Sequence, residues 1–155
     1  MASNRDSIDE APATRAPWHL WAVGIAALLW NAIGAVDYVM TRSHNDAYLN
    51  AVMPGVEPAT VYAFIEAMPI LAQIGWGFGV WGAVAGTLLL LARSRFAIWA
   101  YLGSLIGAVV SFGVQYTGPK PPEGMDDGIM PMVIIAIALG LFLYARAMRT
   151  KGVLR

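Results

Sequence analysis

The sequence predicts an all-α, polytopic membrane protein: an antiparallel bundle of four transmembrane helices, with a short interfacial helix in the first outer loop. Of the 155 residues, 58% are hydrophobic and only 13% are charged, which is too apolar for a soluble domain of this size. The apolar residues also fall into four runs, each close to the ~20 residues that a helix needs to cross a bilayer. Both observations indicate an integral membrane protein.

The chain divides into a polar tail, one membrane domain and a short basic tail. Residues 1–16 are polar and contain Pro12, and we expect them to form a disordered cytoplasmic tail. The four-helix transmembrane domain covers 17–148, and 149–155 form a basic cytoplasmic tail. The predicted spans run about 17–40, 69–92, 96–116 and 129–147, and the outer loops are 41–68 and 117–128.

The connections between the spans set their arrangement. The first span is too long for the apolar region of a signal peptide, so we expect it to be retained. In the first outer loop, Pro58 is placed to begin a short helix, whose apolar residues suit the interface or a fold back onto the bundle. The turn Arg93-Ser94-Arg95 is so short that the second and third spans must be antiparallel neighbours. A proline-rich loop, Gly118–Gly124, leads through Asp126 and Asp127 to the fourth span.

The placement of basic residues predicts the orientation. Two of the ten lie on one side of a four-span topology, namely Arg42 and Lys120. The other eight lie on the opposite side: Arg5, Arg15, Arg93, Arg95, Arg146, Arg149, Lys151 and Arg155. Because cytoplasmic loops carry the excess of Lys and Arg, both termini are predicted to be cytoplasmic.

Small residues recur at helical spacing on the second and third spans and predict closely packed faces. The predicted packing residues are Gly34 on the first span, Gly75, Gly79, Gly82 and Gly86 on the second, and Ser104, Gly107 and Ser111 on the third. A groove between two helices is one interpretation, and a slot for a lipid tail or another flat apolar ligand is the other. Ile33–Val36 also recurs as Ile106–Val109, so a duplicated helical hairpin is possible.

Polar residues inside the apolar runs are the candidate ligand site, because they are costly at membrane depth. The candidates are Asn31, Asp37, Tyr38, Gln73 and Gln115. Asn31 lies roughly 9 Å deeper than Asp37, near the midplane. Asp37 is either a structural residue paired with Arg42 or water, or a ligand or proton site. Asn31 is either a hydrogen-bonding link between helices or a substrate contact.

Several functional classes find no support in the residue pattern. There is no cysteine, and His19 and His44 are predicted on opposite sides of the membrane, so no metal or haem site is expected. No nucleophile, base and orienting residue form a catalytic set, and no glycine-rich loop suits a phosphate. Because the formal net charge is zero, no nucleic-acid partner is expected. The sequence predicts neither catalysis nor a cofactor.

Several segments together resemble one family over nearly the whole chain. They are Pro17–Leu20 with Trp21, Leu28–Thr41, Ala47–Leu49, Gly79–Gly82, Arg93–Arg95, Tyr144–Met148 and Lys151–Leu154. They are similar to those of an uncharacterised family of small four-span bacterial inner-membrane proteins, whose members often carry the label "sugar transporter". The resemblance implies the bacterial inner membrane as the location.

From these residues we predict a non-catalytic inner-membrane protein that acts as an accessory or binding subunit of a membrane complex. One four-helix chain offers mainly Asn31 near the midplane, whereas a sugar transporter needs several polar groups there. A homodimer would double that set, so the alternative is a dimeric, sugar-like small-solute transporter that uses Asn31 and Asp37. The expected partners are the lipid bilayer and either a second copy of the chain or a larger membrane complex.

Overall fold

The computed structural model describes residues 15–125 and 128–155. These residues form six helices and no strand. The helices are α1 (Trp18–Arg42), α2 (Asp46–Val52), α3 (Pro58–Ala67), α4 (Ile70–Leu91), α5 (Ala97–Gln115) and α6 (Met130–Thr150). The predicted tail at 1–16 lies almost wholly outside the described residues, as do Asp126 and Asp127.

Four of the helices are long and apolar enough to cross a membrane, which confirms the predicted fold class. They are α1, α4, α5 and α6, and they contain 25, 22, 19 and 21 residues. Because a helix rises about 1.5 Å per residue, each reaches close to the ~30 Å thickness of a bilayer core or beyond it. Their bounds match the predicted spans within three residues at each end.

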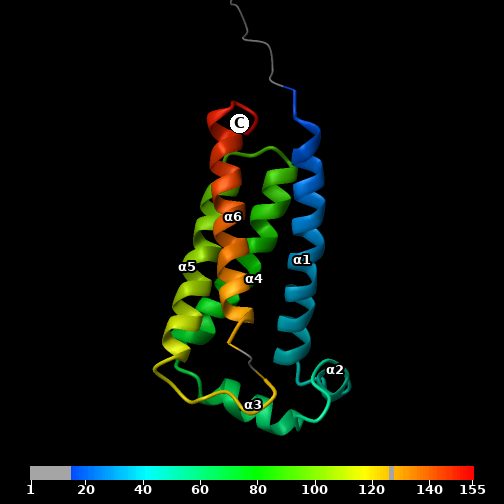
Figure 1. Cartoon of the computed structure of the whole chain (residues 1–155), viewed down its shortest axis with the longest axis vertical. Helices are drawn as coiled ribbons and strands as arrows, with labels where there is room; N and C mark the ends of the chain where they lie inside the picture. The colour runs from blue at the N-terminus through cyan, green and yellow to red at the C-terminus, as the bar shows by residue number, and fades with distance from the viewer. Residues whose placement is uncertain (1–14, 126–127) are drawn as a thin grey trace, which may run out of the picture.

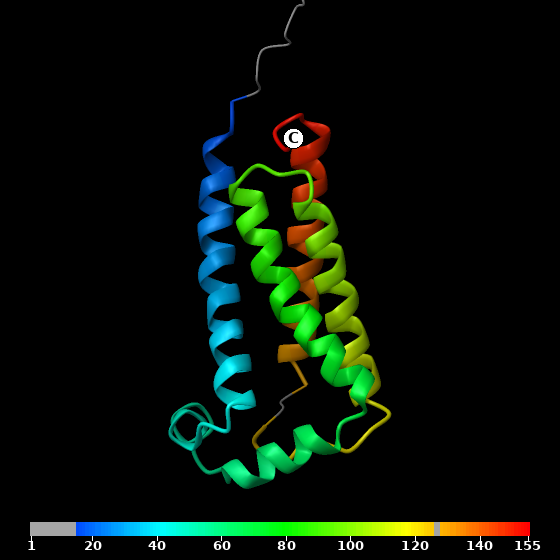
Figure 2. The same ribbon diagram turned by 180° about the vertical axis from the view of Figure 1, so that it is seen from behind.

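The four long helices form an antiparallel bundle with two distinct ends (Figures 1 and 2). At one end α1 begins, α6 ends and a short turn joins α4 to α5. We call it the basic end because Arg93, Arg95, Arg146, Arg149, Lys151 and Arg155 lie there. The opposite, loop end holds α2, α3 and the segment before α6. The predicted segregation of basic residues is therefore present in the fold.

The last residues of the chain fold back onto the α4–α5 turn at the basic end. The N–H of Arg155 donates to the carbonyl of Arg93 at 2.9 Å, and the N–H of Arg95 donates to the carbonyl of Arg155 at 2.7 Å. Val153 and Leu154 are buried in an apolar cluster that closes this end of the bundle. The segment 149–155 is thus part of the folded domain, although its composition predicted a basic tail.

Two short helices cover the loop end, where the sequence predicted one. Helix α3 begins with Pro58, as expected, and lies across the loop end of the bundle (Figure 2). Helix α2 was not predicted. The side chain of Asn45 caps it by accepting a hydrogen bond from the backbone N–H of Tyr48 at 2.9 Å. Both helices pack around a small buried cluster of Leu49, Val61, Phe64 and Ile65.

Helices α4 and α5 form the central pair, and their backbones touch through the predicted small-residue faces. A Cβ atom on Gly107 would lie 2.6 Å from the carbonyl oxygen of Gly75, and one on Gly82 would lie 3.0 Å from the backbone nitrogen of Ser104. Along the same contact, Gly79 faces Ala108, Gly86 faces the ring of Tyr101, and Gly75 also faces Ser111. The hydroxyl of Ser104 donates to the carbonyl of Gly79 at 2.6 Å. The small-residue face of α4 is therefore covered by α5, and that of α5 by α4, within one chain.

Gly34 differs from the other predicted packing residues. A Cβ atom there would meet no atom within 4 Å, because α1 and α4 approach closely at the basic end and separate towards the loop end (Figure 2). Gly107, its counterpart in the possible repeat, lies instead at the close backbone contact between α4 and α5. A Cβ at position 34 would therefore contact no other helix among the described residues, so the two copies of the motif occupy different surroundings.

The central contact predicts different responses at two glycines of α5. In Gly107→Ala the new methyl group would collide with backbone atoms of α4, so we expect a loss of about 1–3 kcal/mol of stability. Gly103→Ala is the matched control, because a Cβ there meets nothing within 4 Å and alanine favours the helix by about 0.5–1 kcal/mol. Unfolding of both purified variants in detergent measures the difference. Equal stability of the two variants would contradict the close contact.

Candidate functional site

A buried polar network links three of the long helices. The Asn31 side chain donates to the hydroxyl of Thr87 at 2.8 Å and to the carbonyl of Ala83 at 3.2 Å. The Thr87 hydroxyl also lies 2.9 Å from the hydroxyl of Tyr101. Asn31, Thr87 and Tyr101 are all buried. Because lipid offers no hydrogen bonds, these groups satisfy one another and join α1, α4 and α5.

Asp37 is held by a tyrosine of the unpredicted helix α2. The hydroxyl of Tyr48 donates to the Asp37 carboxylate at 3.0 Å. Arg42, the partner considered from the sequence, donates instead to the side-chain oxygen of Gln73 at 3.1 Å. Burial raises the pKa of Tyr48, and the adjacent Asp37 charge raises it further. Tyr48 therefore keeps its proton and remains a donor to Asp37 at physiological pH.

The remaining predicted site residues have different surroundings. The Tyr38 ring packs edge-on against Trp76 and Trp81, with ring centroids 4.6 and 6.2 Å away, between α1 and α4. Gln115 is the half-buried last residue of α5. Of the five predicted site residues, only Gln73 lines the polar pocket at the loop end.

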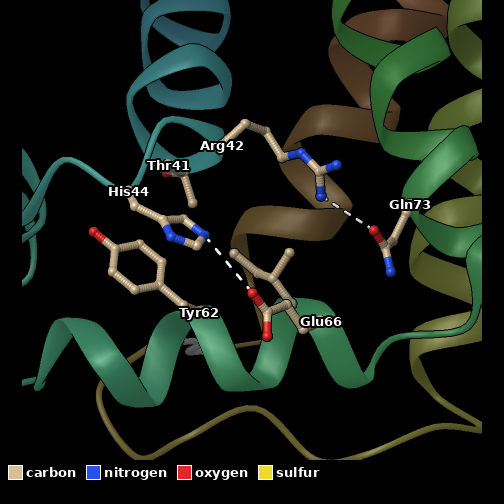
Figure 3. Close-up of a pocket in the computed structure, with 7 residues that line it drawn as sticks. Thr41, Arg42, His44, Tyr62, Glu66 and Gln73 are labelled. Carbon is tan, nitrogen blue, oxygen red and sulfur yellow. Dashed lines mark hydrogen bonds and ion pairs between the residues drawn. The ribbon is translucent and has the colours of Figure 1, made fainter.

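That polar pocket lies between the end of α1, helix α3 and the start of α4 (Figure 3). Its volume is about 270 Å³, and its lining residues are Thr41, Arg42, His44, Tyr62, Ile65, Glu66 and Gln73. The position of each side chain follows from where its helix begins or ends, or from the spacing of residues along the helix. Arg42 is the last residue of α1, Gln73 lies in the first turn of α4, and Tyr62 and Glu66 are one turn apart on α3.

Hydrogen bonds and stacking hold the pocket walls in place. The Gln73 amide donates to the carbonyl of Met68 at 3.0 Å, which leaves its oxygen free to accept from Arg42. The imidazole of His44 stacks on the Tyr62 ring, with centroids 4.2 Å apart and planes inclined by 22°. The Tyr62 hydroxyl in turn donates to Asp46 at 2.8 Å. Apart from Gln73, none of these residues was singled out as a site residue from the sequence.

The pocket carries opposite charges on two walls. Arg42 enters from α1, and Glu66 enters from α3, where its carboxylate lies 3.8 Å from the His44 imidazole (Figure 3). No ion pair joins Arg42 to Glu66 among the described residues. Guanidinium has five N–H donors, and Arg42 uses one of them on Gln73. The pocket can therefore offer a cationic donor and an anionic acceptor to a small solute.

The histidines and acidic residues do not form a metal site in the described part of the chain. His19 lies at the basic end, where its Nδ1 is 2.6 Å from the hydroxyl of Tyr144. His44 lies at the loop end. No protein family, no curated protein and no solved structure matches this chain.

The hydrogen bond between Asp37 and Tyr48 predicts energetic coupling between these two residues. In a double-mutant cycle of Asp37→Asn and Tyr48→Phe, we expect a coupling of about 1 kcal/mol, because the asparagine amide still accepts from Tyr48 but a neutral hydrogen bond is roughly half as strong as one to a carboxylate. A parallel cycle of Asp37→Asn with Arg42→Gln is the control, and its effects should add. Unfolding midpoints in detergent provide both values. Stronger coupling of Asp37 to Arg42 than to Tyr48 would refute this pairing.

Proposed function

We propose that this chain is a non-catalytic membrane protein that binds a small polar solute at its loop end and serves as a binding or accessory subunit. The observation that carries the proposal is the polar pocket in which Arg42 and Glu66 face a shared volume of about 270 Å³. Ligand sites are concave and bring a few polar groups together, and this pocket has that character.

The closed interior favours binding over transport. The polar side chains between the helices, Asn31, Thr87 and Tyr101, already bond to one another. The glycine faces of α4 and α5 are occupied by each other, so they offer no slot for a lipid tail or a partner helix. A transporter instead places unfilled polar groups near the midplane, between halves that move.

The charges of the pocket suit a zwitterion. Arg42 would bind a carboxylate with its unused N–H donors, and Glu66 would accept from an ammonium group. The pocket is slightly smaller than the ~300–1,000 Å³ typical of drug-sized ligands, so we expect a solute of amino-acid size. The side chains of His44 and Glu66 remain 58% and 68% exposed, so the ligand would stay accessible to solvent and exchange readily.

The orientation follows from the charge distribution. Of the described basic residues, only Arg42 and Lys120 lie at the loop end. By the positive-inside rule the basic end faces the cytoplasm and the pocket faces the outside, which is the periplasm in the bacterial inner membrane. A pocket on that side would meet solutes before they cross the membrane. The partner that receives the solute would be a larger membrane complex or a second copy of the chain.

Solute binding to the purified protein tests this proposal. We expect calorimetry to detect binding of alanine, a zwitterion, but not of glucose, which has no charge for Arg42 or Glu66. Arg42→Gln should weaken alanine binding about tenfold or more, since a hydrogen bond to a charged group contributes about 1.5–3 kcal/mol. Lys120→Gln is the matched control, because it removes a cation from the same end but outside the pocket.

Two results would contradict the proposal. One is alanine affinity that is absent, or that is unchanged by Arg42→Gln. The other is saturable glucose uptake into proteoliposomes that Asn31→Leu abolishes, which would favour the dimeric transporter.

A further inference from the structure

A second cavity lies at the basic end, between the start of α5 and the end of α6. Its volume is about 480 Å³, and its lining residues are Ile98, Trp99, Leu102, Phe142, Arg146, Arg149 and Thr150. It is far from the polar pocket, which lies at the opposite end of the bundle. The proposed function does not use it.

The two arginines give this cavity an uncompensated positive charge. Arg146 and Arg149 are exposed, and neither forms an ion pair with a carboxylate in the described part of the chain. The guanidinium of Arg146 lies over the ring of Phe142, 5.8 Å from its centroid. The acidic side chains of the described residues belong to α1 near its loop end or to the loop-end segments: Asp37, Asp46, Glu57, Glu66 and Glu123. Among the described side chains, an anion would therefore meet two cations and no competing carboxylate.

The rest of the cavity is apolar and continues along the bundle. Trp99, which is 62% exposed, lies in the first turn of α5, and Leu102 is one turn further along the same face. On this face the exposed Ile106 follows, and on α6 the exposed Leu139 lies one turn before Phe142. Both helices thus lead from the charged mouth into an apolar track that faces the bilayer core.

We propose that this cavity holds one anionic diacyl phospholipid. Arg146 and Arg149 would bind the headgroup phosphate. Trp99 lies at the level where tryptophan favours the headgroup interface. The acyl chains would follow the apolar track between α5 and α6. Basic pockets between transmembrane helices on the cytoplasmic side are suited to anionic lipid headgroups.

Native mass spectrometry of the full-length protein in detergent tests the site. Phosphatidylglycerol and phosphatidylcholine with identical acyl chains are titrated separately, and we expect about a tenfold or greater preference for phosphatidylglycerol, since each basic residue attracts anionic lipid. The double variant Arg146→Gln with Arg149→Gln should lose this preference. Arg95→Gln with Lys151→Gln is the matched control, because it removes two exposed charges from the same end but outside the cavity.

Two further measurements distinguish a lipid site from a misfolded variant and from a site for free phosphate. Arg146→Lys with Arg149→Lys keeps both charges and should keep most of the preference for phosphatidylglycerol. If the glutamine variant does not fold, this lysine variant still tests whether positive charge at the two positions is enough for that preference. Inorganic phosphate at the lipid concentration should not displace phosphatidylglycerol, because it cannot fill the apolar track.

Four outcomes would overturn the proposal. The first three are equal binding of the two lipids by the native protein, an unchanged preference in the folded glutamine variant, and displacement of the lipid by inorganic phosphate. Loss of preference in the control variant to the same extent would also overturn it, because the attraction would then be general to the basic end.

Discussion

The backbone contact between α4 and α5 is the constraint on which the rest of the structure depends. Helices in lipid gain nothing from burying apolar side chains against each other, so close packing and interhelical hydrogen bonds must hold them together. Gly75, Gly82 and Gly107 allow that approach, and Ser104 adds a hydrogen bond across it. With this pair fixed, α1 packs on α4 and α6 on α5 (Figures 1 and 2). The contact also fixes the start of α4, where Gln73 forms one wall of the pocket.

The two ends of the bundle are built differently, and the candidate functions follow from that difference. At the basic end, the returning C-terminal residues and an apolar cluster close the bundle, and exposed arginines lie around them. At the loop end, α2 and α3 form a folded cover in which polar residues bond across elements, as Tyr48 does with Asp37. A polar pocket is possible there because water, rather than lipid, solvates its open side.

The spans and the small-residue faces could be predicted from the sequence because each depends on a local pattern, namely a long apolar run or glycines at helical spacing. Helix α2 could not, since its seven residues make too few turns to show a period. The partner of Asp37 is Tyr48 of α2, so it was missed as well. The pocket was missed because its walls come from α1, α3 and α4, and no local pattern in the sequence shows how these helices lie relative to one another. The partners of Asn31 were missed because Gly24, well inside α1, is level with the end of α4 at Leu91. If the depth of each residue in the membrane is counted from the end of its own helix, residues of α1 are therefore matched with the wrong residues of α4.

We propose that the bundle interior is closed while the pocket at the loop end is open to the outside. The chain contains no cysteine, so single cysteines can be introduced cleanly as reporters of accessibility. Labelling of intact cells with a membrane-impermeant maleimide compares Glu66→Cys, on the pocket wall, with Thr87→Cys, in the buried network. We expect rapid labelling at position 66 and none at position 87. Labelling at position 87 from outside, or none at position 66, would contradict the claim.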